Sequence, residues 1–136
     1  MREGWIGDAY MILFERTETS EASKGYGISD SLPGYEVIGL RGWDDLIVRD
    51  TEGYMFTVPT VPLDAKHLSP FQMPNEQLQL QADERLLGRI KWYVKPVVFG
   101  GDPSPGKNLV WVDHIEHARL VRYWNNQYRS IAATSS

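Results

Sequence analysis

Short apolar runs separated by turn residues dominate the first half of the chain. Each run has the length and pattern of a β-strand, which predicts strands over residues 9–14, 35–40, 46–49 and 54–58. The connections at 41–45 and 50–53 are short and rich in glycine and aspartate, as in a β-meander. Pro59 and Pro62 should end this ladder, because proline has no N–H to donate to a neighbouring strand.

Helical periodicity is strongest near the end of the sequence, over residues 114–131. Val121, Trp124 and Tyr128 follow one another at spacings of three and four, which places them on one face of a helix. Asp113 and Glu116 form a capping-box pattern at its start. The sequence therefore predicts a long amphipathic helix here.

The remaining segments carry weaker patterns. A short helix is expected within 17–27, a loop over 64–74, and strands over 91–99 and 109–112. Residues 75–89 are ambiguous: apolar spacing favours a helix over part of them, whereas 78–81 alternate as a strand would.

These elements together predict an α+β fold. About six strands in an antiparallel or mixed sheet, with helices packed on it and the C-terminal helix strongest, account for the pattern. The length of 136 residues fits one domain, over 1–131, followed by a low-complexity tail at 132–136.

Composition narrows the range of functions. The chain has no cysteine, which excludes disulfides, thiolate metal sites and a cysteine nucleophile. The net charge of −4 argues against direct nucleic-acid binding and favours a basic partner. The start resembles no signal peptide, and no apolar run approaches the ~18 residues of a membrane span, so a cytoplasmic location without membrane contact is expected.

Two motifs suggest a phosphate site and a metal site, but the residues within each motif argue against that function. Residues 101–108 approximate a phosphate-binding loop, but Pro103 and Pro105 remove backbone donors and Asn108 has no hydroxyl for magnesium. His114 and His117 stand three residues apart and could share a metal ion, or they could simply belong to a capped helix start. The helix start is favoured, and neither a cofactor nor enzymatic activity is expected.

The turn at 41–45 carries the most distinctive side chains. Arg41, Trp43, Asp44 and Asp45 lie there, and Asp50 lies in the next turn. Aspartate is a common turn residue, and Trp43 is expected either to project as an interface anchor or to fold back over the sheet. The hypothesis for these five residues is a partner-binding face.

Several segments resemble the SUKH superfamily. Residues 4–13 read Gly-Trp-Ile-Gly-Asp-Ala-Tyr-Met-Ile-Leu, similar to its segment of glycine, apolar residue, glycine-aspartate, aromatic and apolar run. Residues 32–39 with Gly42, the strand at 46–50 and the proline exit at 54–63 resemble the segments that follow. Residues 99–125 resemble an extension of some bacterial members.

The resemblance implies an α+β fold and, for bacterial members, an immunity protein that binds and blocks a cognate protein toxin, often a nuclease. The alternative is a regulatory or scaffold module that binds another protein. Arg41, Trp43 and Asp44 replace part of a turn that is usually glycine-rich and acidic. The family's first helix has no counterpart in this sequence: either the chain is a shortened member or the gene start lies upstream. Without that helix, an apolar sheet face left uncovered would favour self-association as a homodimer.

Overall fold

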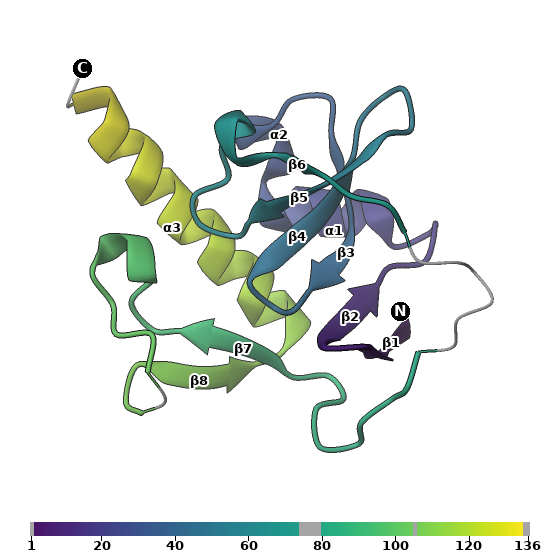
Figure 1. Ribbon diagram of the computed structural model, residues 1–136. Helices are drawn as coiled ribbons and strands as arrows, with labels where there is room; N and C mark the ends of the chain where they lie inside the picture. The colour runs from purple at the N-terminus through teal and green to yellow at the C-terminus, as the bar shows by residue number, and fades with distance from the viewer. Residues whose placement is uncertain (1, 74–79, 105, 135–136) are drawn as a thin grey trace.

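The computed structural model describes residues 2–73, 80–104 and 106–134. Within them, six strands form one antiparallel sheet in chain order (Figure 1). These strands are β1 (Arg2–Ile6), β2 (Ala9–Leu13), β3 (Glu36–Arg41), β4 (Asp45–Arg49), β5 (Met55–Pro59) and β6 (Ser69–Pro70). The predicted meander is therefore confirmed, with β1 and β6 added at its two edges.

Alternation along the strands divides their side chains between the two faces of the sheet. In β2, Tyr10 and Ile12 belong to the main core, whereas Met11 belongs to a smaller cluster on the opposite face. In β4, Ile47 joins Met11. The pairing of β3 with β4 shifts register between Val37 and Gly39, and this bulge interrupts the alternation of β3.

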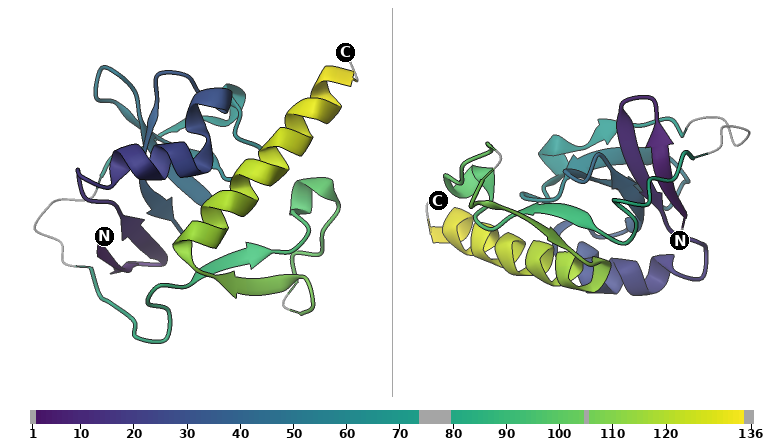
Figure 2. Two further views of the ribbon diagram at one scale, coloured as in Figure 1. Left: turned by 180° about the vertical axis from the view of Figure 1, so that it is seen from behind. Right: turned by 90° about the horizontal axis from the view of Figure 1, so that it is seen from below.

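Helices cover the face that carries the main core. The described chain has α1 (Thr19–Tyr26), α2 (Ile28–Ser31) and α3 (His114–Thr134). The two longer helices, α1 and α3, lie in one layer beside the sheet (Figure 2, right). Gly27 ends α1 in the left-handed conformation that glycine adopts readily.

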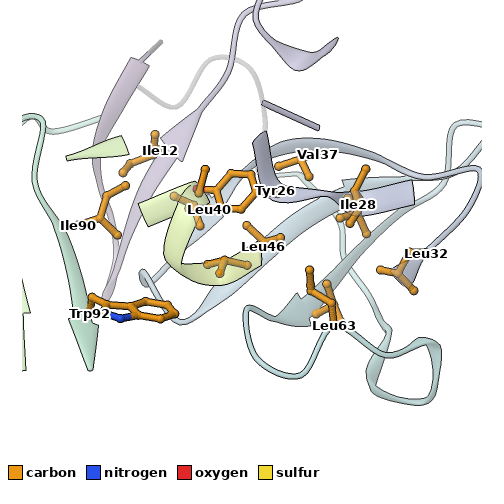
Figure 3. Packing of buried hydrophobic residues seen from close by; sticks show 14 of the residues in the cluster. Ile12, Tyr26, Ile28, Leu32, Val37, Leu40, Leu46, Leu63, Ile90 and Trp92 are labelled. Atoms are coloured by element: carbon orange, nitrogen blue, oxygen red, sulfur yellow. The ribbon is translucent and has the colours of Figure 1, made fainter. Parts of the chain in front are cut away.

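A second, two-stranded sheet completes the main core. It consists of β7 (Ile90–Tyr93) and β8 (Leu109–Val112), which pair antiparallel. Ile90 and Trp92 point into the cluster formed by Tyr26, Leu40 and Leu46 (Figure 3). The residues that alternate with them, Lys91 and Tyr93, are only partly buried. The fold class is thus α+β, with a C-terminal helix spanning both sheets.

The opposite face of the main sheet is covered by the chain itself. Met11, Ile38 and Ile47 are buried there, and side chains including Phe71 and Met73 pack over them. Within the described residues, the sheet face on which the expectation of a homodimer rested is thus covered; self-association itself stays a prediction.

Three segments differ from the sequence prediction. Residues 80–89 form turns and a single bridge from Gln81 to Trp5 instead of a helix, and 75–79 lie outside the described residues. The strand expected over 91–99 ends at Tyr93, and a 3-10 helix, η2 (Val97–Phe99), follows Pro96. Another, η1 (Ala65–His67), lies within the predicted loop.

Candidate functional site

A cleft of about 300 Å³ lies where the β3–β4 turn meets the second sheet. Its walls come from four segments distant in sequence: 43–45, 59–61, 91–93 and 96–98. The volume is at the small end of the range of about 300–1,000 Å³ found for ligand pockets. It therefore suits one side chain or a short segment.

Trp43 forms one wall in a backbone conformation that is unusual for a bulky residue. Its φ is 63°, the same as that of Gly42 before it. Such a residue carries a strain of roughly 1–3 kcal/mol and persists only where its surroundings hold it. Here the ring stacks on Tyr10 at a centroid distance of 5.3 Å and meets the edge of Trp111 at 5.4 Å. The sequence left open whether Trp43 projects as an interface anchor or folds back over the sheet. In the structure its side chain folds back and is half-buried.

Backbone hydrogen bonds fix the turn on both sides. The Gly42 N–H donates to the Tyr10 carbonyl at 2.8 Å, and the Thr60 N–H donates to the Asp44 carbonyl at 3.0 Å. The first bond ties the turn to β2, and the second ties it to the segment that follows β5. The cleft wall is therefore anchored on two independent parts of the chain.

Asp44 and Asp45 form a carboxylate pair on the ridge of this turn. The Asp45 side chain is half-buried. This burial is the main cause that raises the pKa of Asp45, and the negative charge of Asp44 raises it further, whereas the positive charge of Arg41 lowers it. Asp44 is more exposed. Both residues also line a shallow hollow on the other side of the ridge, together with Asp8 and Arg41. Four of the five predicted residues thus lie at one end of the sheet.

Asp50 does not join them. It follows the far end of β4, about 17 Å from Asp45 at ~3.4 Å per strand residue. Its Oδ1 atom accepts hydrogen bonds from the N–H groups of Glu52 and Tyr54, each at 2.9 Å. The structure therefore gives Asp50 the role of a turn residue and separates it from the other four.

Lys91 is the residue of this site that the sequence did not reveal. Its Nζ atom lies 5.9 Å from the ring centre of Trp43 and 5.5 Å from that of Tyr93. The same atom is 3.9 Å from the Asp44 Oδ2 atom. An ammonium group thus sits between two aromatic rings and a carboxylate. The only available signal was the alternation of apolar and amphipathic residues along β7, which does not say what β7 lies against.

Exposed apolar side chains border the cleft on the side of η2. Val94, Val97 and Val98 are 51%, 47% and 49% exposed, and the last two line the cleft. Two buried donors also belong to the lining residues: the Nε1 atoms of Trp43 and Trp92 have no hydrogen-bond partner among the described residues. Buried indole N–H groups usually have one.

His114 and His117 are packing residues at the start of α3. The His117 side chain is fully buried, its Nδ1 atom is 2.7 Å from the Tyr26 hydroxyl, and burial lowers its pKa to about 3. The Glu116 N–H donates to the Asp113 carboxylate at 2.8 Å, which confirms the predicted cap. Across residues 2–73, 80–104 and 106–134, no group of three side chains suited to a metal ion occurs, so the shared-metal interpretation has no third ligand.

The loop that approximates a phosphate-binding motif is closed by Asn108. Its Nδ2 atom donates to the carbonyls of Lys95 and Asp102, both at 3.0 Å, and its Oδ1 atom accepts from the Lys95 N–H at 2.8 Å. The backbone of Lys95 also lies where a side chain at Gly101 would extend. The described part of the loop is thus an inter-strand connection; Pro105 lies outside the described residues.

No protein-family model, curated protein or solved structure matches this chain. No helix in the described parts of the chain is long and apolar enough to cross a membrane.

Proposed function

We propose that the chain is an immunity-type binding protein that neutralises a cognate bacterial toxin by stoichiometric protein–protein binding. The observation that carries the proposal is the cleft at the β3–β4 turn. Aromatic rings, a carboxylate pair and exposed valines converge there, and protein interfaces commonly combine such aromatic anchors with a polar rim. The resemblance to SUKH immunity proteins supplies the class of partner.

The charges at the site favour a basic partner. Asp44 and Asp45 line the cleft, and with Asp8 they also line the neighbouring hollow; these three carboxylates outnumber the two cations there, Lys91 and Arg41. Many nucleases present a basic surface to nucleic acid, and an acidic docking face would accelerate encounter with it and cover it. Blockade of this kind needs a complementary surface and no catalytic group.

The resemblance is also compatible with the structural roles of its residues. Gly7 and Asp8 form the tight turn between β1 and β2, in which Ile6 pairs with Ala9. At Gly39, a Cβ atom would lie 2.4 Å from the Ile12 carbonyl oxygen, so only glycine fits at this position, where β3 pairs with β2. These residues would thus be required by the fold, whichever toxin is bound.

Growth rescue tests the proposal. The chain is co-expressed with a toxin encoded next to its gene, and the affinity and stoichiometry of the purified pair are measured by calorimetry. Rescue and a 1:1 complex are expected. Loss of viability despite full expression of the chain, together with no binding in calorimetry, would refute the toxin-neutralising function; binding of a non-toxin neighbour alone would favour the regulatory module instead.

A pair of matched variants tests the docking face. Asp44→Lys reverses an exposed charge at the cleft, and Asp30→Lys makes the same change at an exposed position on α2. Asp44→Lys should weaken toxin binding at least tenfold, which corresponds to about 1.4 kcal/mol. Asp30→Lys should weaken it less than threefold. Equal effects of the two substitutions would show that net charge, and not this face, determines binding.

A further inference from the structure

We infer that the cleft is a seat for one organic cation, the ammonium or guanidinium group of a partner's basic side chain, and that Lys91 occupies this seat in the free protein. The inference rests on the proposed function for the identity of the partner. The seat itself follows from the geometry around Lys91 and can be tested without a toxin.

The position of the Lys91 ammonium shows what the seat recognises. Cation–π attraction operates within about 6 Å of a ring centre. The Nζ atom meets this limit for two rings, at 5.9 Å for Trp43 and 5.5 Å for Tyr93. Asp44 adds a carboxylate oxygen at 3.9 Å. Two rings and a carboxylate around one positive group form a recognition site for a cation.

Lys91 is a loose occupant of this seat. Its distances to both rings and to Asp44 lie near the outer limits of these interactions. The cleft still encloses about 300 Å³ with the lysine in place. The Lys91 side chain is 24% exposed, so it would have to leave a partly buried position before a basic side chain from outside could take its place beside the rings.

Asp45 gives a second reason to expect another positive charge. Its carboxylate is half-buried beside that of Asp44, and the pKa of Asp45 is raised by burial and by its neighbour. A cation placed in the cleft would lie near both carboxylates and favour the charged form of Asp45. An anion would meet two negative groups, so the site selects against anionic ligands.

The walls also match the rest of a peptide segment. Val97 and Val98 provide exposed apolar contacts for its methylene groups. The indole N–H groups of Trp43 and Trp92 lack acceptors among the described residues, although Trp92 is only 5% exposed. Both Nε1 atoms are buried, so a bound segment would reach them only if the side chains shifted; here the indole N–H signals serve as reporters of binding at the cleft. The ligand is therefore a peptide segment that carries a single lysine or arginine into the cleft.

The test titrates the full-length protein with short peptides. The probes are acetyl-Gly-Lys-Gly-amide and acetyl-Gly-Arg-Gly-amide, with the acetyllysine form of the first as the neutral control. Binding is followed by two-dimensional NMR of the indole N–H signals. Lys91→Met removes the competing ammonium but keeps the aliphatic stem, and Lys107→Met makes the same change at an exposed loop position.

Lys91→Met should bind the two basic peptides at least tenfold more tightly than the wild type, with shifts of the Trp43 and Trp92 signals. Lys107→Met should behave as the wild type, and the neutral peptide should bind no variant. Adding Asp44→Asn to Lys91→Met should reverse the gain. The signal dispersion of each variant shows whether it is folded, and Lys91→Gln replaces Lys91→Met if the latter is not.

Two results would overturn the seat: equal affinity of wild type and both Lys91 variants for the basic peptides, or equal binding of the neutral peptide. Failure of the toxin experiments is a separate outcome. If the peptides bind as expected and no toxin is neutralised, the seat stands and the proposed function does not. If a toxin is neutralised and Lys91→Met gains nothing, the function stands and the toxin uses another contact.

Discussion

Asn125 joins α3 to the segment that leaves the main sheet, and its replacement gives the sharpest test of the fold. The side chain is 2% exposed. Its Oδ1 atom accepts from the Leu63 N–H at 2.7 Å, and its Nδ2 atom donates to the Thr60 carbonyl at 2.7 Å and the Val121 carbonyl at 2.8 Å. Because Thr60 lines the cleft, the same amide also positions one of its walls.

Asn125→Ala should lower the free energy of unfolding by about 3 kcal/mol. Two buried backbone groups, the Leu63 N–H and the Thr60 C=O, would lose their partner, and each orphaned group costs about 1–3 kcal/mol. The Val121 carbonyl would keep a hydrogen-bond partner, because the backbone N–H four residues later in the helix donates to it. Urea unfolding followed by tryptophan fluorescence measures the effect: with a slope near 1.5 kcal/mol/M, the midpoint should fall by about 2 M.

Asn126→Ala is the matched control. Asn126 is exposed on the same helix, so its loss should change stability by less than about 0.5 kcal/mol. Asn125→Asp keeps the volume and one acceptor but turns the donor into an acceptor facing two carbonyls, so it should also destabilise. If Asn125→Ala and Asn126→Ala unfolded at the same urea concentration, the idea that this amide holds the cleft wall to α3 would be wrong.

Two further predictions concern the core. Burial lowers the pKa of His117 from 6.5 to about 3, so below pH 6.5 the unfolded chain binds more protons than the folded one. The free energy of unfolding should therefore be greatest above that pH and fall on acidification by up to ~1.4 kcal/mol per pH unit. Urea unfolding at a series of pH values measures this loss. The substitution His117→Gln should flatten it down to about pH 5, whereas His67→Gln, at an exposed position, should not. Gly39→Ala should destabilise by more than about 2 kcal/mol because its Cβ would meet a carbonyl oxygen at 2.4 Å. Gly25→Ala, within α1 and in ordinary contact at 3.4 Å, should instead raise the melting temperature through about 0.5–1 kcal/mol of helix propensity.

Local patterns predicted the elements that local interactions define. The strands β2 to β5 were predictable because alternation and turn residues lie within each hairpin. The last helix was predictable because its cap and its apolar stripe are contained in one segment. Both kinds of signal act over a few residues, so they remain readable without knowledge of the tertiary fold.

Elements that depend on distant partners were not predictable in this way. β1 begins Arg-Glu-Gly and has no clear apolar alternation; its pairing with β2 through the turn at Gly7 stabilises it. Residues 80–89 have apolar residues at helical spacing, yet the backbone of Gln81 pairs with Trp5 across the sheet edge. In both segments long-range pairing overrides local propensity.

The candidate site was predictable only in part for the same reason. Trp43, Asp44 and Asp45 stand together in one turn, so the sequence placed them together. Lys91 reaches them only because β7 packs against that turn, a contact between segments far apart in sequence. Asp50 was grouped with them because of its nearness in sequence, but the length of β4 separates it from them. Sequence proximity was thus a good guide within a turn and a poor one across a strand.

Two unfavourable features coincide at this cleft, and they support the proposal that it binds a partner. Trp43 is held in a strained left-handed conformation, and the indole donors of Trp43 and Trp92 lack acceptors among the described residues. Neither feature stabilises the free chain, and departures from local rules of this kind concentrate at functional positions. A bound segment would use the rigid aromatic wall without having to order it. In the proposed site, the exchange of Lys91 for a partner's basic group is the main rearrangement expected, and this would leave most of the interaction energy for affinity.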